Sequence, residues 1–98
     1  MILRVVRMTF REDRVADFLQ NFELNKEKIR NFAGCRYLEL WQDEHYKNIF
    51  MTYSHWESEE ALNQYRDSEL FKSVWGFTKT LFAAKPMAFS AKKIDELP

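Results

Sequence analysis

The spacing of hydrophobic residues changes several times along the chain, and each change marks an element. Residues 2–10 are mostly apolar and rich in β-branched side chains, in a run too short for a typical helix, so we expect a strand. Residues 13–31 instead follow the i, i+3, i+4, i+7 spacing of an amphipathic helix, with Asp13 as its N-cap and Gly34 beyond its end. The apolar stripe of this helix consists of Val15, Phe18, Leu19, Phe22 and Ile29.

Two strands follow the first helix. Residues 35–42 and 47–56 are rich in aromatic and aliphatic side chains and are separated by the polar residues 43–46. A short polar connection between two such runs is typical of a β-hairpin, although the Asn-Gly signal is missing.

The second helical region predicts two segments. Ser58 is the expected N-cap of the first, and Ser68 looks like a second cap, so the helix should bend or restart there. From Leu70 the apolar spacing is again helical, and it ends at Lys85-Pro86 because proline disfavours a helical residue before it. Residues 87–94 form a last strand, weaker than the others because Ala and Lys are poor strand formers.

The predicted order of elements is β-α-β-β-α-β in a single domain of residues 1–98. This order favours an α+β, ferredoxin-like fold, in which a four-stranded antiparallel sheet carries both helices on one face. The charged residues 92–98 are expected to form a flexible tail.

Both faces of the predicted sheet carry apolar side chains. In the third strand, Ile49, Met51, Tyr53 and His55 alternate with Phe50, Thr52, Ser54 and Trp56. The second strand likewise opposes Leu38 and Leu40 to Tyr37 and Trp41. Two helices cover one face only, so we expect a second copy to cover the other, which predicts a homodimer formed through the sheet. The alternative is scattered surface apolar residues, which are common in monomers.

Composition narrows the classes of partner. Fifteen basic residues balance fifteen acidic ones, which argues against nucleic acid or an anionic membrane surface as the main partner. No apolar run approaches the ~20 residues that span a bilayer, and the N-terminus lacks the features of a signal peptide. A single cysteine fits a reducing compartment, so a cytoplasmic protein is expected.

Candidates for metal or nucleophilic chemistry are few. His45 and His55 lie roughly 30 Å apart along an extended run, too far to share a metal ion within one chain. The hairpin brings Cys35 near His55, and a Cys–His pair would form only if the register places both on one face. A buried free cysteine that packs as a small hydrophobe is the commoner outcome. We therefore expect no metal site.

Polar and aromatic residues of the helices and the sheet form the remaining candidate site. The helices contribute Asn63, Tyr65, Phe71 and Trp75, and the sheet contributes Arg4, Tyr53 and His55. One interpretation is an ordinary aromatic core. The other is a flat apolar pocket between helices and sheet, with a few donors that orient an aromatic ligand.

One segment resembles the antibiotic biosynthesis monooxygenase family of small dimeric α+β barrel proteins. Residues 56–62 (WESEEAL), followed by Tyr65, Ser68 and Phe71, are similar to the family pattern W-x-S-x-x-A-L-x-x-H-x-x-S-x-x-F. The Gly34-Cys35 entry to the second strand also matches, and the resemblance covers nearly the whole chain.

The resemblance implies an enzyme that oxygenates a small aromatic or quinol-like substrate without metal, flavin or other cofactor. Such an enzyme orients a substrate that loses a phenolic proton, stabilises the anion and excludes water while the anion reacts with O2. The corresponding pocket walls and donors are Tyr65 and Trp75, with Asn63 and His55 as further polar candidates. Arg4, Val6, Tyr53 and Phe71 would complete the substrate pocket.

The chain also departs from the family in two ways. The haem-degrading branch uses an Asn, a Trp and a His where this chain carries Val6, Tyr65 and Trp75, so an axial iron ligand is missing. The frequent family His of the short helix is Tyr65 here, and tyrosine is a poor base at neutral pH. Two alternatives therefore remain beside the monooxygenase: a non-catalytic dimeric module that binds an apolar metabolite, and an isomerase-type enzyme on the same scaffold.

Overall fold

A computed structural model describes all 98 residues of the chain. The strands are β1 (Ile2–Thr9), β2 (Cys35–Gln42), β3 (Ile49–Trp56) and β4 (Met87–Ala91). The helices are α1 (Val15–Arg30), α2 (Glu59–Arg66) and α3 (Glu69–Thr78), with 3₁₀ turns at Glu12–Arg14 and Lys79–Leu81.

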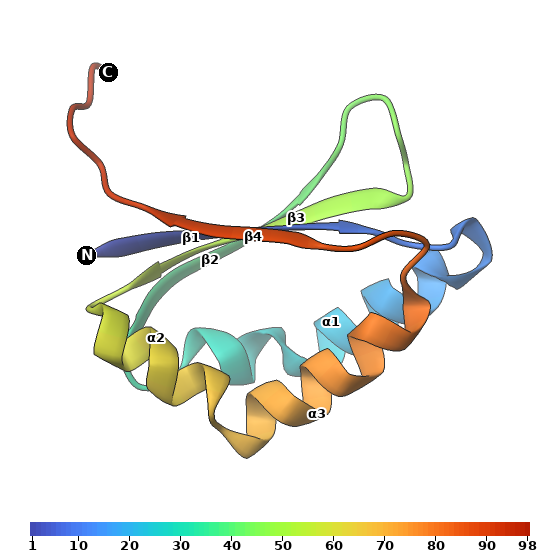
Figure 1. Ribbon diagram of the computed structural model, residues 1–98, viewed down its shortest axis with the longest axis horizontal. Coiled ribbons are helices and arrows are strands. Elements are labelled where there is room, and N and C mark those ends of the chain that lie inside the picture. Colours follow the sequence, from blue (N-terminus) through green and yellow to red (C-terminus); the bar gives the residue numbers. More distant parts are fainter.

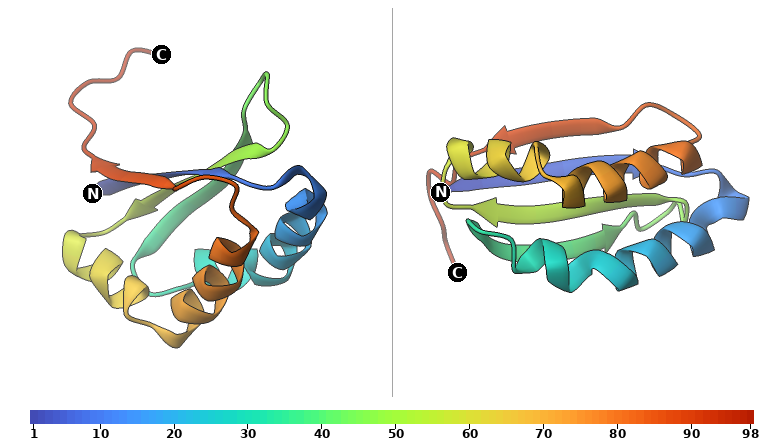
Figure 2. Two further views of the ribbon diagram at one scale, coloured as in Figure 1. Left: turned by 45° about the vertical axis from the view of Figure 1, so that its right-hand side comes forward. Right: turned by 90° about the horizontal axis from the view of Figure 1, so that it is seen from below.

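All strand pairs are antiparallel, and they form one sheet in the order β2-β3-β1-β4. The three helices lie on one side of this sheet, and no helix lies on the other side (Figure 1). Seen from below, α1 runs along the β2 side of the sheet, and α2 and α3 run along the β1 and β4 side (Figure 2). The predicted α+β, ferredoxin-like arrangement is confirmed. None of the helices has both the length and the apolar character that crossing a membrane requires.

Asp13 does not cap the first helix, so that prediction was wrong. Asp13 lies inside the 3₁₀ turn, and the N-cap position of α1 falls one residue later, at Arg14, with no side-chain cap. Arg14 Nε instead donates to Asp17, 2.6 Å away, and the carboxylate of Asp17 lies in the first helical turn, where a negative charge is favourable.

The two serine caps are confirmed. Ser58 Oγ accepts a hydrogen bond from the Ala61 N–H, and Ser68 Oγ accepts one from the Phe71 N–H, both at 3.1 Å. Ser68 also donates to the carbonyl of Tyr65, so one side chain ends α2 and begins α3.

Several element boundaries differ from the prediction: β1 ends at Thr9 and α1 spans Val15–Arg30, each a residue or two shorter than expected at the ends that differ. β3 begins at Ile49 rather than at residue 47, and β4 ends at Ala91 rather than at residue 94. α3 ends at Thr78, well before Lys85-Pro86, because a 3₁₀ turn and an isolated bridge between Phe10 and Phe82 replace the helix there. A bridge of this kind depends on tertiary contact, which the local pattern does not contain.

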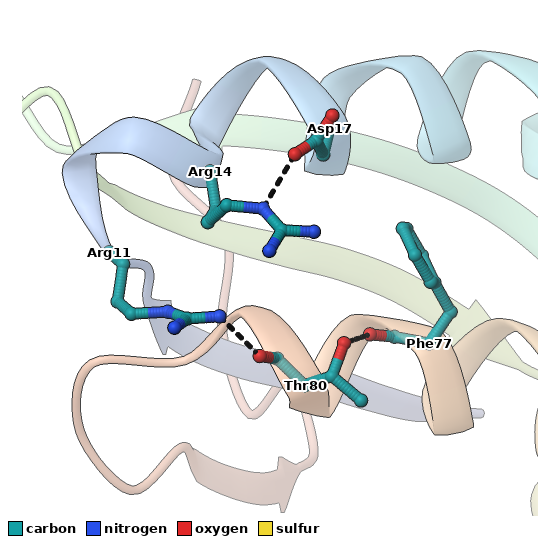
Figure 3. A network of polar contacts seen from close by, with 5 residues as sticks. All are labelled: Arg11, Arg14, Asp17, Phe77 and Thr80. Carbon is teal, nitrogen blue, oxygen red and sulfur yellow. Dashed lines mark hydrogen bonds and ion pairs between the residues drawn. The ribbon is translucent and has the colours of Figure 1, made fainter.

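A polar contact fastens the two helical regions together. Arg11 reaches from the turn before α1 and donates to the carbonyl of Thr80, 2.8 Å away, while Thr80 Oγ1 donates to the carbonyl of Phe77 (Figure 3). The end of α3 is therefore held against the start of α1.

The inner face of the sheet carries two separate core clusters, one at each end. The first contains Met8, Phe10, Phe18, Phe50 and Leu81, and the second contains Cys35, Trp56 and Leu62. Between them the inner face presents two rows of paired residues, which are Leu38–Ser54–Arg4–Ser90 and Leu40–Thr52–Val6–Ala88. Several of these side chains are small or polar, so they fill little of the space below the helices.

Gly34 positions the second cluster. Its φ of +89° is a conformation that side chains rarely adopt, and a Cβ there would meet Ala61 Cβ at 2.5 Å. Only glycine therefore allows β2 to begin this close to α2.

We predict that Gly34→Ala lowers the free energy of unfolding by roughly 1–3 kcal/mol, through backbone strain and the contact with Ala61. Gly76 is the matched control. It lies inside α3, and a Cβ there would enter open space, so Gly76→Ala should stabilise the protein by about 0.5–1 kcal/mol. Urea unfolding measures both changes. Equal effects of the two substitutions would contradict this account of Gly34.

Candidate functional site

A cavity of about 330 Å³ lies between the two core clusters, with the sheet on one side and all three helices on the other. The sheet contributes Arg4, Val6, Met8, Leu38, Thr52, Ser54, Trp56 and Ala88. The helices contribute Phe18, Phe22, Ile29, Leu62, Tyr65, Arg66, Phe71, Val74, Trp75 and Thr78. Most of these side chains are apolar, and no Asp, Glu or His lines the cavity. Its volume is within the range of small-molecule sites.

Tyr65 is held by aromatic packing at one end of the cavity. Its ring stacks on Trp56, with centroids 4.8 Å apart, and meets Phe32 and Phe71 edge to face. Burial raises the pKa of the Tyr65 hydroxyl well above its usual range, and the nearby Cys35 adds to the effect. Tyr65 lines the cavity and its hydroxyl makes no hydrogen bond to the chain, so it offers an uncommitted donor to a ligand.

Trp75 forms a second wall. Its ring is nearly parallel to that of Phe71, with centroids 6.0 Å apart, and contacts Phe82 edge to face. The other two tryptophans use their indole N–H groups within the chain, Trp56 on Ser54 and Trp41 on Glu39, each at 2.9 Å. The Trp75 N–H has no such partner and remains available.

Two arginines bring positive charge to the cavity. Arg4 extends from β1 and donates to Ser90 Oγ at 3.1 Å, and Arg66 extends from the last turn of α2. Burial, and then the charge of Arg66, lower the pKa of the Arg4 guanidinium from its usual value. A guanidinium nevertheless stays protonated at neutral pH.

The structure brings together five of the eight residues predicted for the site. Arg4, Val6, Tyr65, Phe71 and Trp75 line the cavity. Asn63 is exposed on α2 and lines a neighbouring cavity instead.

Tyr53 and His55 lie on the open face of the sheet, opposite the cavity. There, His55 Nε2 and the Tyr53 hydroxyl are hydrogen-bonded at 2.9 Å, beside the rings of Tyr37 and Trp41. Their alternation with Ser54 and Trp56 along β3 turns them away from the helices.

The hypothetical Cys35–His55 pair does not form. Cys35 is buried against Trp56 and Leu62 on the inner face, whereas His55 lies on the open face. A register shift between Cys35 and Tyr37 pairs Cys35 with Trp56 and Tyr37 with His55, so Cys35 and Tyr37 lie on opposite faces of the sheet. Cys35 is a free, buried thiol, and burial raises its pKa.

The sequence did not predict the other thirteen lining residues, among them Arg66, Thr52, Ser54 and Ala88. A usable signal existed for Arg66, because Leu62, Tyr65 and Arg66 follow the i, i+3, i+4 spacing of one helix face. The three small residues gave no signal, since a small side chain in a strand does not show whether a helix will pack against it.

Comparison with known proteins identifies the family. The sequence profile of the family described as antibiotic biosynthesis monooxygenase matches residues 1–74, three quarters of the chain. The chain belongs to the antibiotic biosynthesis monooxygenase family. A search of curated protein sequences finds no match.

Several solved structures share the fold of this chain at low sequence identity. A crystal structure described as an antibiotic biosynthesis monooxygenase superposes with a TM-score of 0.91 at 15% identity, covering 97% of this chain and all of the other. A conserved protein from Methanosarcina mazei Go1 gives 0.88 at 19% identity, covering 95% and 93% of the two chains. The protein Rv0793 from Mycobacterium tuberculosis gives 0.88 at 16% identity, covering 99% and 98%.

The family motif has structural tasks in this chain. Trp56 is the last residue of β3 and is buried in the core, Ser58 caps α2, and Ala61 packs closely against Gly34. Ser68 caps α3. The motif therefore identifies a monooxygenase-family fold more strongly than it identifies a chemical reaction.

We predict that Tyr65 does not ionise in the folded protein at the pH where tyrosines ordinarily do. Because its folded pKa is raised, Tyr65 contributes stability that is fully present below the unfolded pKa of about 10 and is lost as pH rises beyond it. Urea unfolding at increasing pH should therefore show a steeper alkaline loss of stability for the wild type than for Tyr65→Phe. Identical alkaline slopes would contradict the burial of this hydroxyl.

Proposed function

We propose that the protein is a cofactor-independent monooxygenase acting on a small aromatic, quinol-like substrate. The observation that carries this proposal is the apolar cavity, in which the Tyr65 hydroxyl and the Trp75 N–H have no partner in the chain. Membership of the antibiotic biosynthesis monooxygenase family supports the general class of this proposal, and the substrate and the reaction are inferred from the cavity.

The reaction needs no external reductant. A hydroquinone carries four available electrons: O2 inserts one oxygen atom into a ring C–H as a hydroxyl, and the other leaves as water. The ring is oxidised to a hydroxyquinone, so the quinol and O2 balance the products. The protein has to bind the ring, favour its deprotonated form and exclude water.

The residues of the cavity suit these tasks. Tyr65 stays protonated because burial raises its pKa, so it acts as a hydrogen-bond donor to a substrate oxygen and not as a base. Trp75 supplies a second donor and a flat wall for the ring. The positive charges of Arg4 and Arg66, where the cavity borders its polar neighbour, lower the free-energy cost of a negative charge on the ligand.

A non-catalytic binding module is the second candidate. No His, Asp or Glu lines the cavity, so no carboxylate or imidazole is placed to remove a proton. This observation also makes an isomerase-type enzyme less suitable, because such a reaction depends on a general base.

The active protein is proposed to be a homodimer joined through the open faces of two sheets. This face carries Tyr37, Trp41, Tyr53, Met87 and Phe89, and Met87 and Phe89 are 60% and 48% exposed. Neighbouring open-face positions include Val5 and Leu3, so the apolar surface is continuous across the strands. A second copy would remove this surface from water.

A cytoplasmic location is part of the proposal. The single cysteine of the chain, Cys35, is a free thiol, and free thiols persist in reducing compartments.

We predict that the protein sediments at micromolar concentration with twice the 11.9 kDa mass of one chain. Phe89→Glu should yield the single-chain mass, because dimerisation would bury an unpaired charge. Leu24→Glu is the control, since Leu24 is 69% exposed on α1, away from the sheet. A wild type that sediments as a single chain would refute the dimer.

Oxygen uptake with a panel of hydroquinones tests the reaction. We expect one O2 consumed per quinol and, with ¹⁸O2, one labelled oxygen in the product. The Tyr65→Phe, Trp75→Phe double variant removes both donors and should lower kcat/KM by at least about tenfold. Phe77→Leu, at an exposed position of α3 outside the cavity, should leave it unchanged. Uptake no faster than the buffer blank would reject the monooxygenase, and tight binding of the quinols would then favour the binding module.

A further inference from the structure

The apolar cavity adjoins a second, polar cavity at a pair of guanidinium groups. The second cavity is also about 330 Å³ and lies between α2 and the β1–β4 side of the sheet. Arg4, Leu62 and Arg66 line both cavities, so the two arginines stand where apolar lining gives way to polar lining.

These arginines have no carboxylate partner. The chain forms four ion pairs, which join Arg14 to Asp17, Lys26 to Glu23, Arg36 to Glu57 and Lys93 to Glu96. Arg4 and Arg66 are in none of them. Lys92 adds a third positive charge to the lining of the polar cavity, and Glu59 is its one carboxylate.

The two guanidinium groups act on each other. Arg4 is partly buried and Arg66 is exposed, and the charge of Arg66 lowers the pKa of Arg4, so an anion placed between them would be attracted by both charges. Arg4 gives one hydrogen bond, to Ser90 Oγ, and a guanidinium has five N–H donors. Planar donor groups of this kind match a carboxylate, which accepts two parallel hydrogen bonds.

We propose that the ligand is an aromatic carboxylate, whose ring enters the apolar cavity and whose carboxylate lies between Arg4 and Arg66. This rests on the proposed function in one respect, namely that the ring beside Tyr65 and Trp75 is the part that reacts. The arginine pair then fixes which end of the ligand faces solvent and which enters the cavity. It also selects acids over neutral aromatics of the same shape.

Binding of 1-naphthoate and of 1-naphthamide, measured by calorimetry, tests the proposal. The two probes share shape and ring system and differ in charge. We expect the wild type to bind naphthoate at least about tenfold more tightly than naphthamide, as charge-assisted hydrogen bonds to a carboxylate predict. This preference should shrink as salt concentration rises.

Substitutions locate the preference. Arg66→Gln and Arg4→Gln should each weaken naphthoate binding by about tenfold and leave naphthamide binding unchanged. Arg66→Glu should reverse the preference, and because Arg66 is exposed at a helix end this variant keeps the fold even if Arg4→Gln does not. Lys72→Gln removes the same charge from an exposed position of α3 outside both cavities and should leave the preference intact.

The outcomes separate this inference from the proposed reaction. A naphthoate preference that disappears in the arginine variants supports the carboxylate site whether or not any quinol consumes oxygen. Equal binding of the two probes, or a preference that persists in Arg66→Glu, overturns the site even if neutral quinols are oxygenated.

Discussion

The small residues at the middle of the inner sheet face are the constraint on which this structure depends. Thr52, Ser54 and Ala88 occupy positions between the two core clusters, where larger side chains would join those clusters into one. The helices are supported at both ends of the sheet, by Phe10 and Phe18 at one end and by Trp56 and Leu62 at the other. Because close packing is satisfied at the ends, the centre can remain open as a cavity.

Because side chains alternate along β3, the strand contributes residues both to the cavity and to the open face of the sheet. Ser54 and Trp56 face the cavity, whereas Tyr53 and His55 face the open side of the sheet. A shift of one residue would exchange the two sets, so the register holds the proposed association surface and the proposed reaction site apart at the same time. On the open face, the Glu39 carboxylate accepts hydrogen bonds from Tyr37 and Trp41, and these bonds lower its pKa. A charge satisfied in this way is less costly to cover with a second sheet.

The polar groups of the cavity can stabilise charge on a ligand, but none of them is a carboxylate or imidazole that would remove a proton. Tyr65 and Trp75 are neutral donors, and Arg4 and Arg66 are permanent cations. No His, Asp or Glu lines the cavity. Such a site can stabilise an anionic ligand and orient it, and the reactivity must then come from the ligand itself.

The sequence by itself determined the order of the elements, the two serine caps and the two faces of each strand, because these follow from residue spacing and local hydrogen bonding. The polar and aromatic character of Tyr65, Phe71, Trp75 and Arg4, and the family resemblance for Val6, also pointed to five residues that line the cavity. Only the tertiary structure decided that His55 and Tyr53 lie outside the cavity, and that Arg66 and the small strand residues line it. These depend on which face of the sheet receives the helices and on how closely they pack. Neither choice is encoded in the local pattern of a strand that is apolar on both sides.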